Sequence, residues 1–487
     1  MRLIDVVPAD ARGVLAAEVI VTGITLDSRS VAPGDIYAAL PGHVTHGARF
    51  AADAVGSGAV AILTDPDGAD ACTGLEVPVV VVDHPRESLG LVSSRVYGAP
   101  ADALQLLGIT GTNGKTTVAT MVESGLRAAG RTTGFIGTIG VQIDGMSHEG
   151  ARTTPEASDL HAILAVMREA GVTSVVMEVS SIAIEESRVN AVRYDVAAFT
   201  NLSQDHLDYH GTMEQYFSAK ARLFTPDRAE LGIVGTDDSW GRRLADEATI
   251  PVQSWSLLDA RADWHAVRHD AGLAIVGPDG HREPVIVPMP GAFNAANAVC
   301  AFAVLRSAGI DSRTAAAGIA ATTVPGRMQV VGEHAGVLGI VDYAHSPDAI
   351  SRVLMAARED RSGRVIVVLG AGGDRDRGKR PHMGRMAARL ADVVIVTDDN
   401  PRSEDPASIR RAVLEGAEEV APQTRAEIRD VGDRGEAITV AVDVAEAGDV
   451  VLVLGKGHEQ GQEAAGVVTP FDDASVLRAA LEAGEVR

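Results

Sequence analysis

The sequence predicts an α/β protein of three domains, because strand-sized apolar runs alternate with Ala-rich helical stretches along its 487 residues. This length exceeds what a single hydrophobic core usually serves. A glycine-rich turn at residues 108–117 separates an apolar run from an amphipathic stretch, the order typical of a phosphate-binding loop. We expect a small N-terminal α/β domain over residues 1–101, a central parallel-sheet domain carrying the phosphate loop over 102–328, and a C-terminal Rossmann-like α/β domain over 329–487.

The composition excludes several classes of protein. Apolar residues make up 46% of the chain, and 43 Lys and Arg against 66 Asp and Glu give a net charge of −23. A disordered chain would be poorer in apolar residues, and a general nucleic-acid binder would carry a basic surplus. Cys72 and Cys300 lack metal-site spacing, and the longest apolar runs are far shorter than a bilayer span. We expect no signal segment. We expect a cytoplasmic, monomeric protein with reduced thiols, no nucleic-acid partner and no stable membrane insertion.

The N-terminal block contains three short apolar runs, at residues 36–40, 60–64 and 77–82, which we expect to be strands. Polar segments lie beside them: LDSR at 26–29, PGD at 33–35 and GHVTHG at 42–47. By themselves these segments are a weak signal, because plain turns between strands have the same kind of sequence.

The central block opens with the segment GITGTNGKTT at residues 108–117. An apolar run enters it, and a helix leaves it with Val118, Met121, Val122 and Leu126 on one face. Glycines let backbone amides approach phosphates, a helix N-terminus favours negative charge, Lys115 supplies a cation, and the hydroxyl of residue 116 can bind Mg²⁺. The strict GxxxxGK[ST] pattern fails because residue 109 is Ile, and an ordinary glycine turn with an exposed lysine is the alternative. The flanking strand and helix favour a nucleotide site.

A carboxylate follows the next apolar run, at residues 174–179, where Glu178 lies near its end. A carboxylate at the carboxyl edge of a strand beside a phosphate loop can bind Mg²⁺, directly or through water. A lone acidic residue at such a position is more often merely solvated.

A lysine lies on an apolar helix face farther along the chain. The polar segment TNLSQDHLDYHG at 200–211 follows a strand expected at 195–199, and the next helix, from Thr212, places Lys220 in line with Tyr216 and Phe224. A core-facing lysine is costly unless its charge is removed or paired. Lys220 either extends its ammonium to solvent or reacts as a neutral amine with CO₂. The resulting carbamate would be a metal ligand beside His206.

The C-terminal block has three similar strands, expected at 364–369, 392–397 and 449–454, each followed by a polar cluster. Carboxyl ends of strands in an open parallel sheet form a crevice where ligands bind. Arg375, Asn400, Arg402 and Glu459 can therefore converge, with arginines for carboxylates and a glutamate for an ammonium. The alternative is a set of solvated loop residues. A dinucleotide motif fails because its third glycine position, 375, is arginine.

Together these segments resemble the Mur ligase family of ATP-dependent amide-forming enzymes over nearly the whole chain. The motifs are TGTNGKTT at 110–117, EVSS at 178–181, TNLSQDHLDYHG at 200–211, GAFNAANA at 291–298, PGRM at 325–328 and DYAHSPD at 342–348. One departure is Ile182, where the family commonly has His after EVSS.

The resemblance implies a set of ATP and metal contacts. It assigns catalytic roles to Lys115, Glu178, His206 and Lys220, and two Mg²⁺ ions to Thr116, Glu178, His206 and carbamylated Lys220. The implied ATP-binding residues are Gly111, Thr112, Asn113, Gly114, Lys115, Thr116, Thr117, Asn294, Arg327, Asp342 and His345.

Both ends of the chain look like the MurE-type members, which implies UDP-N-acetylmuramoyl-dipeptide and meso-diaminopimelate as substrates. The segment DNPR at 399–402 goes with diaminopimelate rather than lysine, since Arg402 would neutralise the second carboxylate. The implied UDP-substrate residues are Ser28, His43, Val44, Thr45, Thr153, Thr154, Ser181 and Arg188. The implied amino-acid residues are Arg375, Asp399, Asn400, Arg402, Gly455 and Glu459.

The activity implied is ATP-dependent addition of meso-diaminopimelate to UDP-N-acetylmuramoyl-L-Ala-D-Glu through an acyl phosphate, in cytoplasmic peptidoglycan precursor synthesis. A lysine-adding relative or a folylpolyglutamate-synthetase-like ligase is the nearer alternative. An ATP-dependent regulatory or binding module, which forms no amide, is the alternative from another class.

Overall fold

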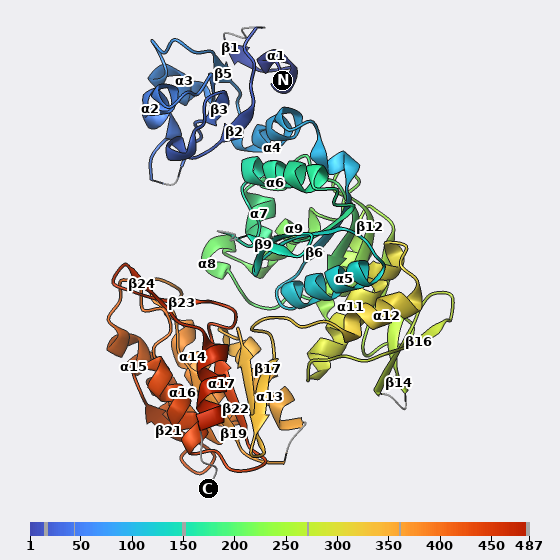
Figure 1. Cartoon of the computed structure of the whole chain (residues 1–487), viewed down its shortest axis with the longest axis vertical. Coiled ribbons are helices and arrows are strands. Elements are labelled where there is room, and N and C mark those ends of the chain that lie inside the picture. Colours follow the sequence, from blue (N-terminus) through green and yellow to red (C-terminus); the bar gives the residue numbers. More distant parts are fainter. Residues whose placement is uncertain (14–17, 43, 149–151, 270–271, 360–361, 484–487) are drawn as a thin grey trace. The chain divides into compact units, whose positions relative to one another are not determined.

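The computed structural model describes the chain except for residues 14–17, 43, 149–151, 270–271, 360–361 and 484–487 (Figure 1). The described residues form two compact units, Met1–Val285 with Val299–Ile319 and Ile286–Ala298 with Ala320–Arg487. Each unit contains its own sheets and hydrophobic cores.

The first unit begins with a five-stranded sheet in the order β1-β5-β4-β3-β2, parallel except for the β1–β5 pair. Successive residues of β3 alternate between two cores: Ile36 packs with the core that includes α1 and α4, and Tyr37 with the core that includes α2. The elements are α1 Leu3–Val6, β1 Arg12–Gly13, β2 Gly23–Thr25, β3 Asp35–Ala38, α2 Ala51–Gly56, β4 Ala61–Thr64, α3 Pro66–Ala71, β5 Val79–Val81 and α4 Pro85–Val96. The three strands expected here are confirmed, each slightly shorter than its apolar run.

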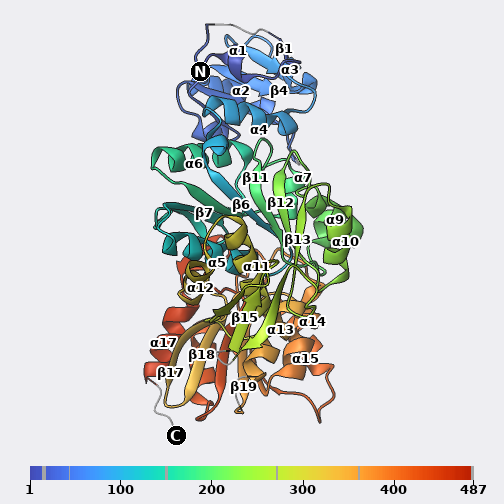
Figure 2. The same cartoon turned by 90° about the vertical axis from the view of Figure 1, so that its right-hand side faces the viewer.

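The rest of the first unit is built on an 11-stranded sheet in which β6 lies between β10 and β11, parallel to both. Figure 2 shows β6, β11, β12 and β13 side by side in this sheet. Antiparallel strands extend it at both edges. The strands are β6 Gln105–Thr110, β7 Thr133–Gly137, β8 Gly140–Ile143, β9 Met146–His148, β10 Ser174–Glu178, β11 Tyr194–Phe199, β12 Ala229–Gly235, β13 Val252–Ser256, β14 Trp264–His269, β15 Gly272–Val276 and β16 Arg282–Val285.

Helices cover this sheet because their apolar faces match its buried strands. The predicted face of α5 is confirmed, since Val118, Met121, Val122 and Leu126 are fully buried. The helices are α5 Lys115–Ala128, α6 Ala157–Glu169, α7 Ser181–Glu185, α8 Leu207–His210, α9 Met213–Ala221, α10 Ser239–Glu247, α11 Ala292–Ser307 and α12 Ser312–Ala320, with the start of α11 in the second unit.

The second unit has a six-stranded sheet in the order β17-β18-β22-β19-β20-β21, parallel except for β17. Helices α16 and α17 contact one face of the sheet through a shared core. Helices α14 and α15 pack against each other and contact β20, and α15 also contacts β21. The elements are β17 Gln329–His334, β18 Val337–Asp342, α13 Pro347–Glu359, β19 Val365–Leu369, α14 Lys379–Leu390, β20 Val393–Val396, α15 Pro406–Glu418, β21 Glu427–Asp430, α16 Arg434–Asp443, β22 Val450–Leu454, β23 Gly461–Ala464, β24 Val467–Pro470 and α17 Asp473–Ala483.

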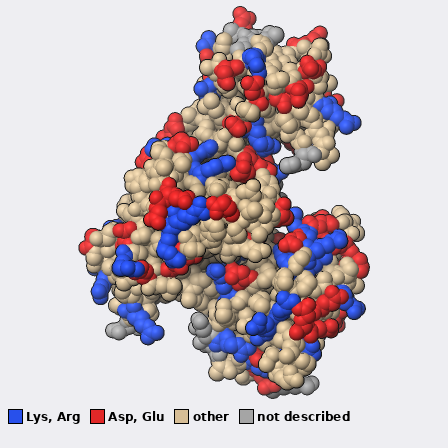
Figure 3. All heavy atoms as spheres, turned by 180° about the vertical axis from the view of Figure 1, so that it is seen from behind, with Lys and Arg blue, Asp and Glu red and all other residues tan. Residues whose placement is uncertain are grey.

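The predicted α/β class with several largely parallel sheets is confirmed. The domain boundaries after residues 101 and 328 remain predictions. Among the described residues, no helix combines the length and hydropathy needed to cross a bilayer. On the face in Figure 3, basic side chains are interspersed with acidic ones, so the acidic surplus leaves room for local positive sites.

Candidate active site

The phosphate loop connects the buried strand β6 to helix α5 through two glycines with left-handed backbone conformations. Gly111 has φ +143° and Gly114, which precedes α5, has φ +86°. A Cβ added at Gly111 would lie 1.9 Å from the Thr200 hydroxyl oxygen. Glycine is therefore required here by close approach as well as by backbone conformation.

The segment that follows β11 holds the phosphate loop in place. Thr112 N donates to the Asn201 carbonyl at 2.9 Å, and Asn113 N donates to Asn201 Oδ1 at 3.0 Å. The Thr200 hydroxyl and Asn201 Nδ2 both donate to the Asn113 carbonyl, at 2.6 and 3.0 Å. These bonds fix the loop from a segment almost 90 residues away, so TGTNGKTT and TNLS form one structural unit.

Lys115 is the first residue of α5, and its ammonium lies over the loop. Its Nζ donates to the carbonyls of Gly111 and Thr112, at 3.0 and 2.9 Å. Thr116 and Thr117 follow it, each only 4% exposed. The lysine and the helix N-terminus together make this loop a favourable place for negative charge.

Lys220 reaches the same loop from helix α9. It is 1% exposed, and its Nζ donates to the Gly111 carbonyl at 2.8 Å and lies 4.8 Å from the centre of the Tyr216 ring. Burial, and then the charge of Lys115, hold the pKa of Lys220 well below its usual range. The buried apolar face predicted for this helix is confirmed, although Phe224 lies beyond its end. The alternative of an ammonium extended to solvent is wrong.

Glu178 ends strand β10 and is fully buried. Its two carboxylate oxygens accept bonds from Thr138, one from the backbone N at 2.8 Å and one from the hydroxyl at 3.1 Å. The alternative of a solvated strand-end carboxylate is therefore wrong. The Thr154 hydroxyl donates to the Glu178 carbonyl at 2.9 Å, and Thr138 and Thr153 share a hydroxyl bond at 3.1 Å.

His206 precedes the short helix α8 with φ +51°, a left-handed conformation that is uncommon for residues other than glycine. Its Nε2 lies 3.6 Å from Asp205, and its ring packs edge-on to Tyr216, with 6.3 Å between ring centres. Partial burial lowers the pKa of His206, while Asp205 opposes the shift. A neutral imidazole can serve as a metal ligand.

His210 was not among the predicted site residues, although it lies in the predicted polar segment. It is 7% exposed, and its Nε2 forms a 2.9 Å bond with the Ser181 hydroxyl. Its ring lies 5.0 Å from that of Tyr216, whose hydroxyl bonds Thr112 at 3.1 Å. His210 thus links predicted substrate contact Ser181 to the phosphate loop through Tyr216.

Arg188 lies beside the predicted substrate threonines but is held by carboxylates. It forms ion pairs with Glu156 at 3.1 Å and Glu186 at 2.5 Å, and its Nη1 donates to the Thr154 carbonyl at 3.3 Å. Ile182 is half-buried within α7.

The predicted UDP contacts of the N-terminal sheet are on its surface. Ser28 begins a short 3₁₀ turn capped by Asp27, while Val44 and Thr45 are exposed, Val44 by 98%. His43 lies outside the described residues. Sequence reasoning missed His46, whose Nε2 lies 3.0 Å from Asp65 and which accepts a bond from Ala48 N, so its role here is to shape the loop.

The second unit contains the remaining predicted ATP contacts. Asn294 is 2% exposed and donates to the Pro290 carbonyl at 2.7 Å. Asp342 ends β18 and accepts bonds from Met328 N and Ala344 N, at 2.7 and 2.8 Å, and burial raises the pKa of Asp342. The Arg327 guanidinium lies 4.3 Å from the Tyr343 ring, and His345 Nδ1 bonds the Tyr343 carbonyl at 2.8 Å.

Most of the predicted amino-acid contacts gather where β20 and β22 end. We call Asp399, Asn400, Arg402, Gly455, Lys456 and Glu459 the strand-end cluster. Asn400 Nδ2 donates to Glu459 Oε2 at 2.7 Å. Arg402, with φ +53°, donates to the Gly373 carbonyl at 2.8 Å and lies 3.4 Å from Glu463.

One predicted contact, Arg375, lies beside this cluster, and one member of the cluster, Lys456, was not predicted. Arg375 is exposed on the loop after β19, and a Cβ added at Gly372 would lie 3.7 Å from its Cγ and 2.9 Å from Arg402 Nη1, so both arginines border one glycine. Lys456, fully buried, was missed by sequence reasoning because its partner Asn400 lies 56 residues away in the sequence. Its one signal is its position in the motif GKGHE after an apolar strand.

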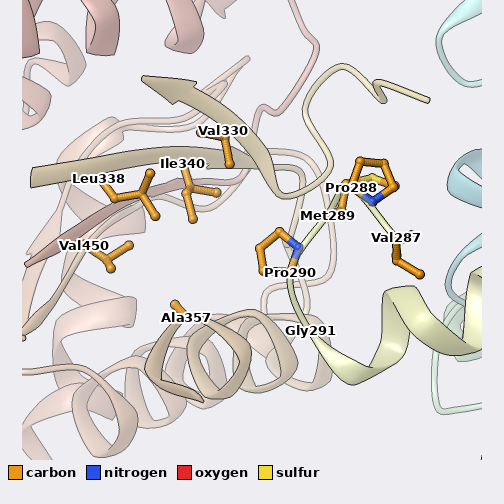
Figure 4. A pocket seen from close by; sticks show the side chains of 10 residues that line it. All are labelled: Val287, Pro288, Met289, Pro290, Gly291, Val330, Leu338, Ile340, Ala357 and Val450. Carbon is orange, nitrogen blue, oxygen red and sulfur yellow. The ribbon is translucent and has the colours of Figure 1, made fainter. Parts of the chain in front are cut away.

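The second unit also has an apolar pocket of about 650 Å³, which Figure 4 shows between the 287–291 segment, β17, β18, β22 and α13. Its lining contains no charged side chain, and none of the predicted site residues contributes to it.

In the described part of the chain, no three His, Cys, Asp or Glu residues gather as a metal site. A metal at the phosphate loop would therefore need oxygens of other kinds, such as the Thr116 hydroxyl and the Lys220 carbamate of the predicted ligand set.

Known proteins match the chain along its length. Family models match residues 20–97 (Mur ligase family, catalytic domain), 109–305 (Mur ligase middle domain) and 326–457 (Mur ligase, glutamate ligase domain). The UDP-N-acetylmuramoyl-L-alanyl-D-glutamate--2,6-diaminopimelate ligase of Streptomyces coelicolor is 50% identical over 483 residues, 97% of this chain and 95% of that protein.

Solved structures agree. A UDP-N-acetylmuramoyl-L-alanyl-D-glutamate--2,6-diaminopimelate ligase matches 99% of both chains, with 32% identity and a TM-score of 0.70. The MurF ligase of Thermotoga maritima, solved in complex with ADP, matches 96% of this chain and 99% of that one with a TM-score of 0.64, and its 18% identity is a likeness of fold alone.

Proposed function

The chain belongs to the Mur ligase family, and we propose that it is the ATP-dependent ligase that joins 2,6-diaminopimelate to UDP-N-acetylmuramoyl-L-alanyl-D-glutamate. The observation that carries the proposal is the strand-end cluster. On one sheet edge it holds Arg402, which can bind a carboxylate, and Glu459, which can bind an ammonium. We propose a monomeric, cytoplasmic enzyme of peptidoglycan precursor synthesis.

The first step activates a carboxylate. The D-glutamate carboxylate attacks the γ-phosphorus of ATP, the bond to the β–γ bridging oxygen breaks, and ADP leaves an acyl phosphate behind. Two anions must meet, so the site has to neutralise their repulsion. Lys115 and the α5 N-terminus supply positive charge at the loop, and the bonds from Asn201 keep the loop in place before ATP arrives.

The metal ligands proposed are Thr116 and Glu178 for one Mg²⁺, and His206 with carbamylated Lys220 for another. Mg²⁺ would offset charge on the phosphate oxygens when bound. Glu178 suits this role because Thr138 fixes both of its oxygens. Lys220 suits carbamate formation because its lowered pKa favours the neutral amine, whose nitrogen attacks CO₂ and loses a proton.

The second step forms the amide. The amine nitrogen of the bound amino acid attacks the acyl carbon, phosphate leaves, and the nitrogen loses a proton. Arg402 would pair with the carboxylate at the far end of diaminopimelate, and Glu459 with its ammonium. Lysine lacks that second carboxylate and would leave Arg402 without its ligand, at a cost of about 1–3 kcal/mol.

One assay tests the proposal. ADP and amide product are measured with ATP and Mg²⁺, with and without the UDP-dipeptide, plus meso-diaminopimelate, L-lysine, L-glutamate or no amino acid. We expect product with diaminopimelate, at least about tenfold less with lysine, and ADP release only when both acceptor and dipeptide are present. Equal use of lysine would overturn the amino-acid assignment, and ADP release without either co-substrate would favour a regulatory ATPase.

A further inference from the structure

Lysine is rare in this chain. Of its 43 basic residues only four are lysines, at positions 115, 220, 379 and 456, and the others are arginines. Two of the four donate to the Gly111 carbonyl at the phosphate loop. Since arginine supplies nearly all other positive charge, a lysine inside the second unit indicates a place where a compact ammonium is needed.

Lys456 is that lysine. It follows Gly455 at the end of β22 and is 0% exposed. Its Nζ donates to Asn400 Oδ1 at 3.0 Å and to Glu459 Oε2 at 3.2 Å. A buried ammonium is costly unless it is paired in this way, so its position depends on these two oxygens.

The contacts of Lys456 determine how Asn400 is oriented. Asn400 Oδ1 accepts both from Lys456 and from Glu463 N, the latter at 2.9 Å. The amide nitrogen must then face the other way, where it donates to Glu459 Oε2 at 2.7 Å. Both bonds to the Glu459 carboxylate thus end on Oε2, which fixes the rotation of that carboxylate.

We infer that Lys456 is a positioning residue for the amino-acid acceptor: it holds the Asn400 amide and the Glu459 carboxylate in the orientation that receives the acceptor's ammonium. The inference rests on the proposed function and adds a residue to its acceptor site. Lys456 acts through Asn400 and Glu459 and does not contact the acceptor itself.

An arginine would not replace this lysine. Its planar guanidinium is larger and directs its donors in a fixed fork, whereas the Lys456 ammonium fits between two oxygens with no exposed surface. Conservation of charge alone therefore would not restore the acceptor site.

The test compares the wild type with Lys456→Met and Lys456→Arg, and with Arg429→Met, which removes an arginine whose partner Glu427 is exposed, as the control. We expect both Lys456 variants to raise the KM for meso-diaminopimelate about tenfold or more, with the KM values for ATP and UDP-dipeptide within about twofold. Calorimetric binding of diaminopimelate should weaken by the same factor. Arg429→Met should match the wild type.

A double variant separates positioning from general stability. If Lys456 acts through Asn400 and Glu459, Lys456→Met should raise the KM for diaminopimelate by a smaller factor in the Asn400→Ala background than in the wild type. An unchanged diaminopimelate KM in a folded Lys456→Met variant, or an equal rise in all three KM values, would overturn the inference. Should Lys456→Met fail to fold, Lys456→Gln takes its place, and its KM for diaminopimelate is compared with its KM values for ATP and UDP-dipeptide in the same way. A wild type that forms no amide would instead contradict the proposed function.

Discussion

At the scale of single residues, Lys220 has a chemical environment unlike that of an ordinary lysine. It is buried against Tyr216, near a second ammonium, and bonds a backbone carbonyl. Burial and the charge of Lys115 both favour the neutral amine, so the lowered pKa of Lys220 increases the fraction of nucleophilic amine.

We therefore predict a carbamate on Lys220. After equilibration with ¹³C-bicarbonate, the ¹³C NMR spectrum should show a carbamate signal that Lys220→Arg abolishes; with four lysines in the chain, overlap is small. Lys220→Ala should lower kcat about 100-fold or more and regain part of it with added short carboxylates. A wild-type spectrum without a carbamate signal, or full activity of Lys220→Ala, would contradict this.

Arg402 should determine the choice between diaminopimelate and lysine. Its guanidinium bonds the Gly373 carbonyl and lies near Glu463 at the sheet edge. Arg402→Ala should raise the KM for diaminopimelate about 10–100-fold, and leave the KM for ATP within about twofold, because the lost interaction involves one carboxylate. Steady-state kinetics with each substrate varied in turn provides the check. An unaltered preference of Arg402→Ala for diaminopimelate over lysine would show that another residue binds the second carboxylate.

Some site residues could be predicted from the sequence, whereas others could not because their contacts join segments distant in the sequence. Lys220 was found because helical spacing alone placed it on an apolar face, and Lys115 because its motif is contiguous. Lys456 bonds Asn400, 56 residues away, and His210 bonds Ser181, 29 residues away. Such contacts depend on how strands are ordered in a sheet, which local pattern does not contain.

At the scale of elements, helices α16 and α17 are joined by a buried ion pair. Arg434 and Asp473, the first residues of the two helices, are both 0% exposed and share two bonds of 2.7 Å. Arg434 also donates to the Leu454 carbonyl at 3.0 Å, directly before the strand-end cluster. The pair therefore connects the packing of two helices to the site.

Breaking this pair should be costly. Arg434→Met leaves the Asp473 carboxylate buried without its partner and should lower the free energy of unfolding by about 3–5 kcal/mol. Arg434→Met/Asp473→Leu should recover most of the loss, since no buried charge remains. Urea unfolding followed by circular dichroism checks both, with Arg429→Met expected to cost less than about 1 kcal/mol. A loss no larger than that of the control would mean that water reaches the pair.

Elements differ in how well the sequence predicts them. Buried parallel strands such as β19 and β22 read as continuous apolar runs and were predicted to within a residue. The β23–β24 hairpin was missed because its residues are largely exposed and lack apolar alternation. It matters nonetheless, since Glu463 and Gln462 of β23 bond Asn400 and Asp399.

At the scale of the whole molecule, a net charge of −23 coexists with sites built to hold anions. The cations of those sites, such as Lys115 and Arg402, are single residues at loops and strand ends. Long-range repulsion and short-range attraction should therefore respond differently to salt, because the Debye length falls from about 30 Å at 0.01 M to about 10 Å at 0.1 M.

We predict a salt optimum that depends on the charge of the substrate. As KCl rises from 10 to 100 mM, kcat/KM for the UDP-dipeptide should rise about twofold, because repulsion from the acidic surface is screened before the local contacts are. Higher salt should lower it again. Diaminopimelate, zwitterionic near neutral pH, is the internal control and should change little below 100 mM. A steady decrease for the UDP-dipeptide from the lowest salt would show that the local cations dominate its approach at every distance.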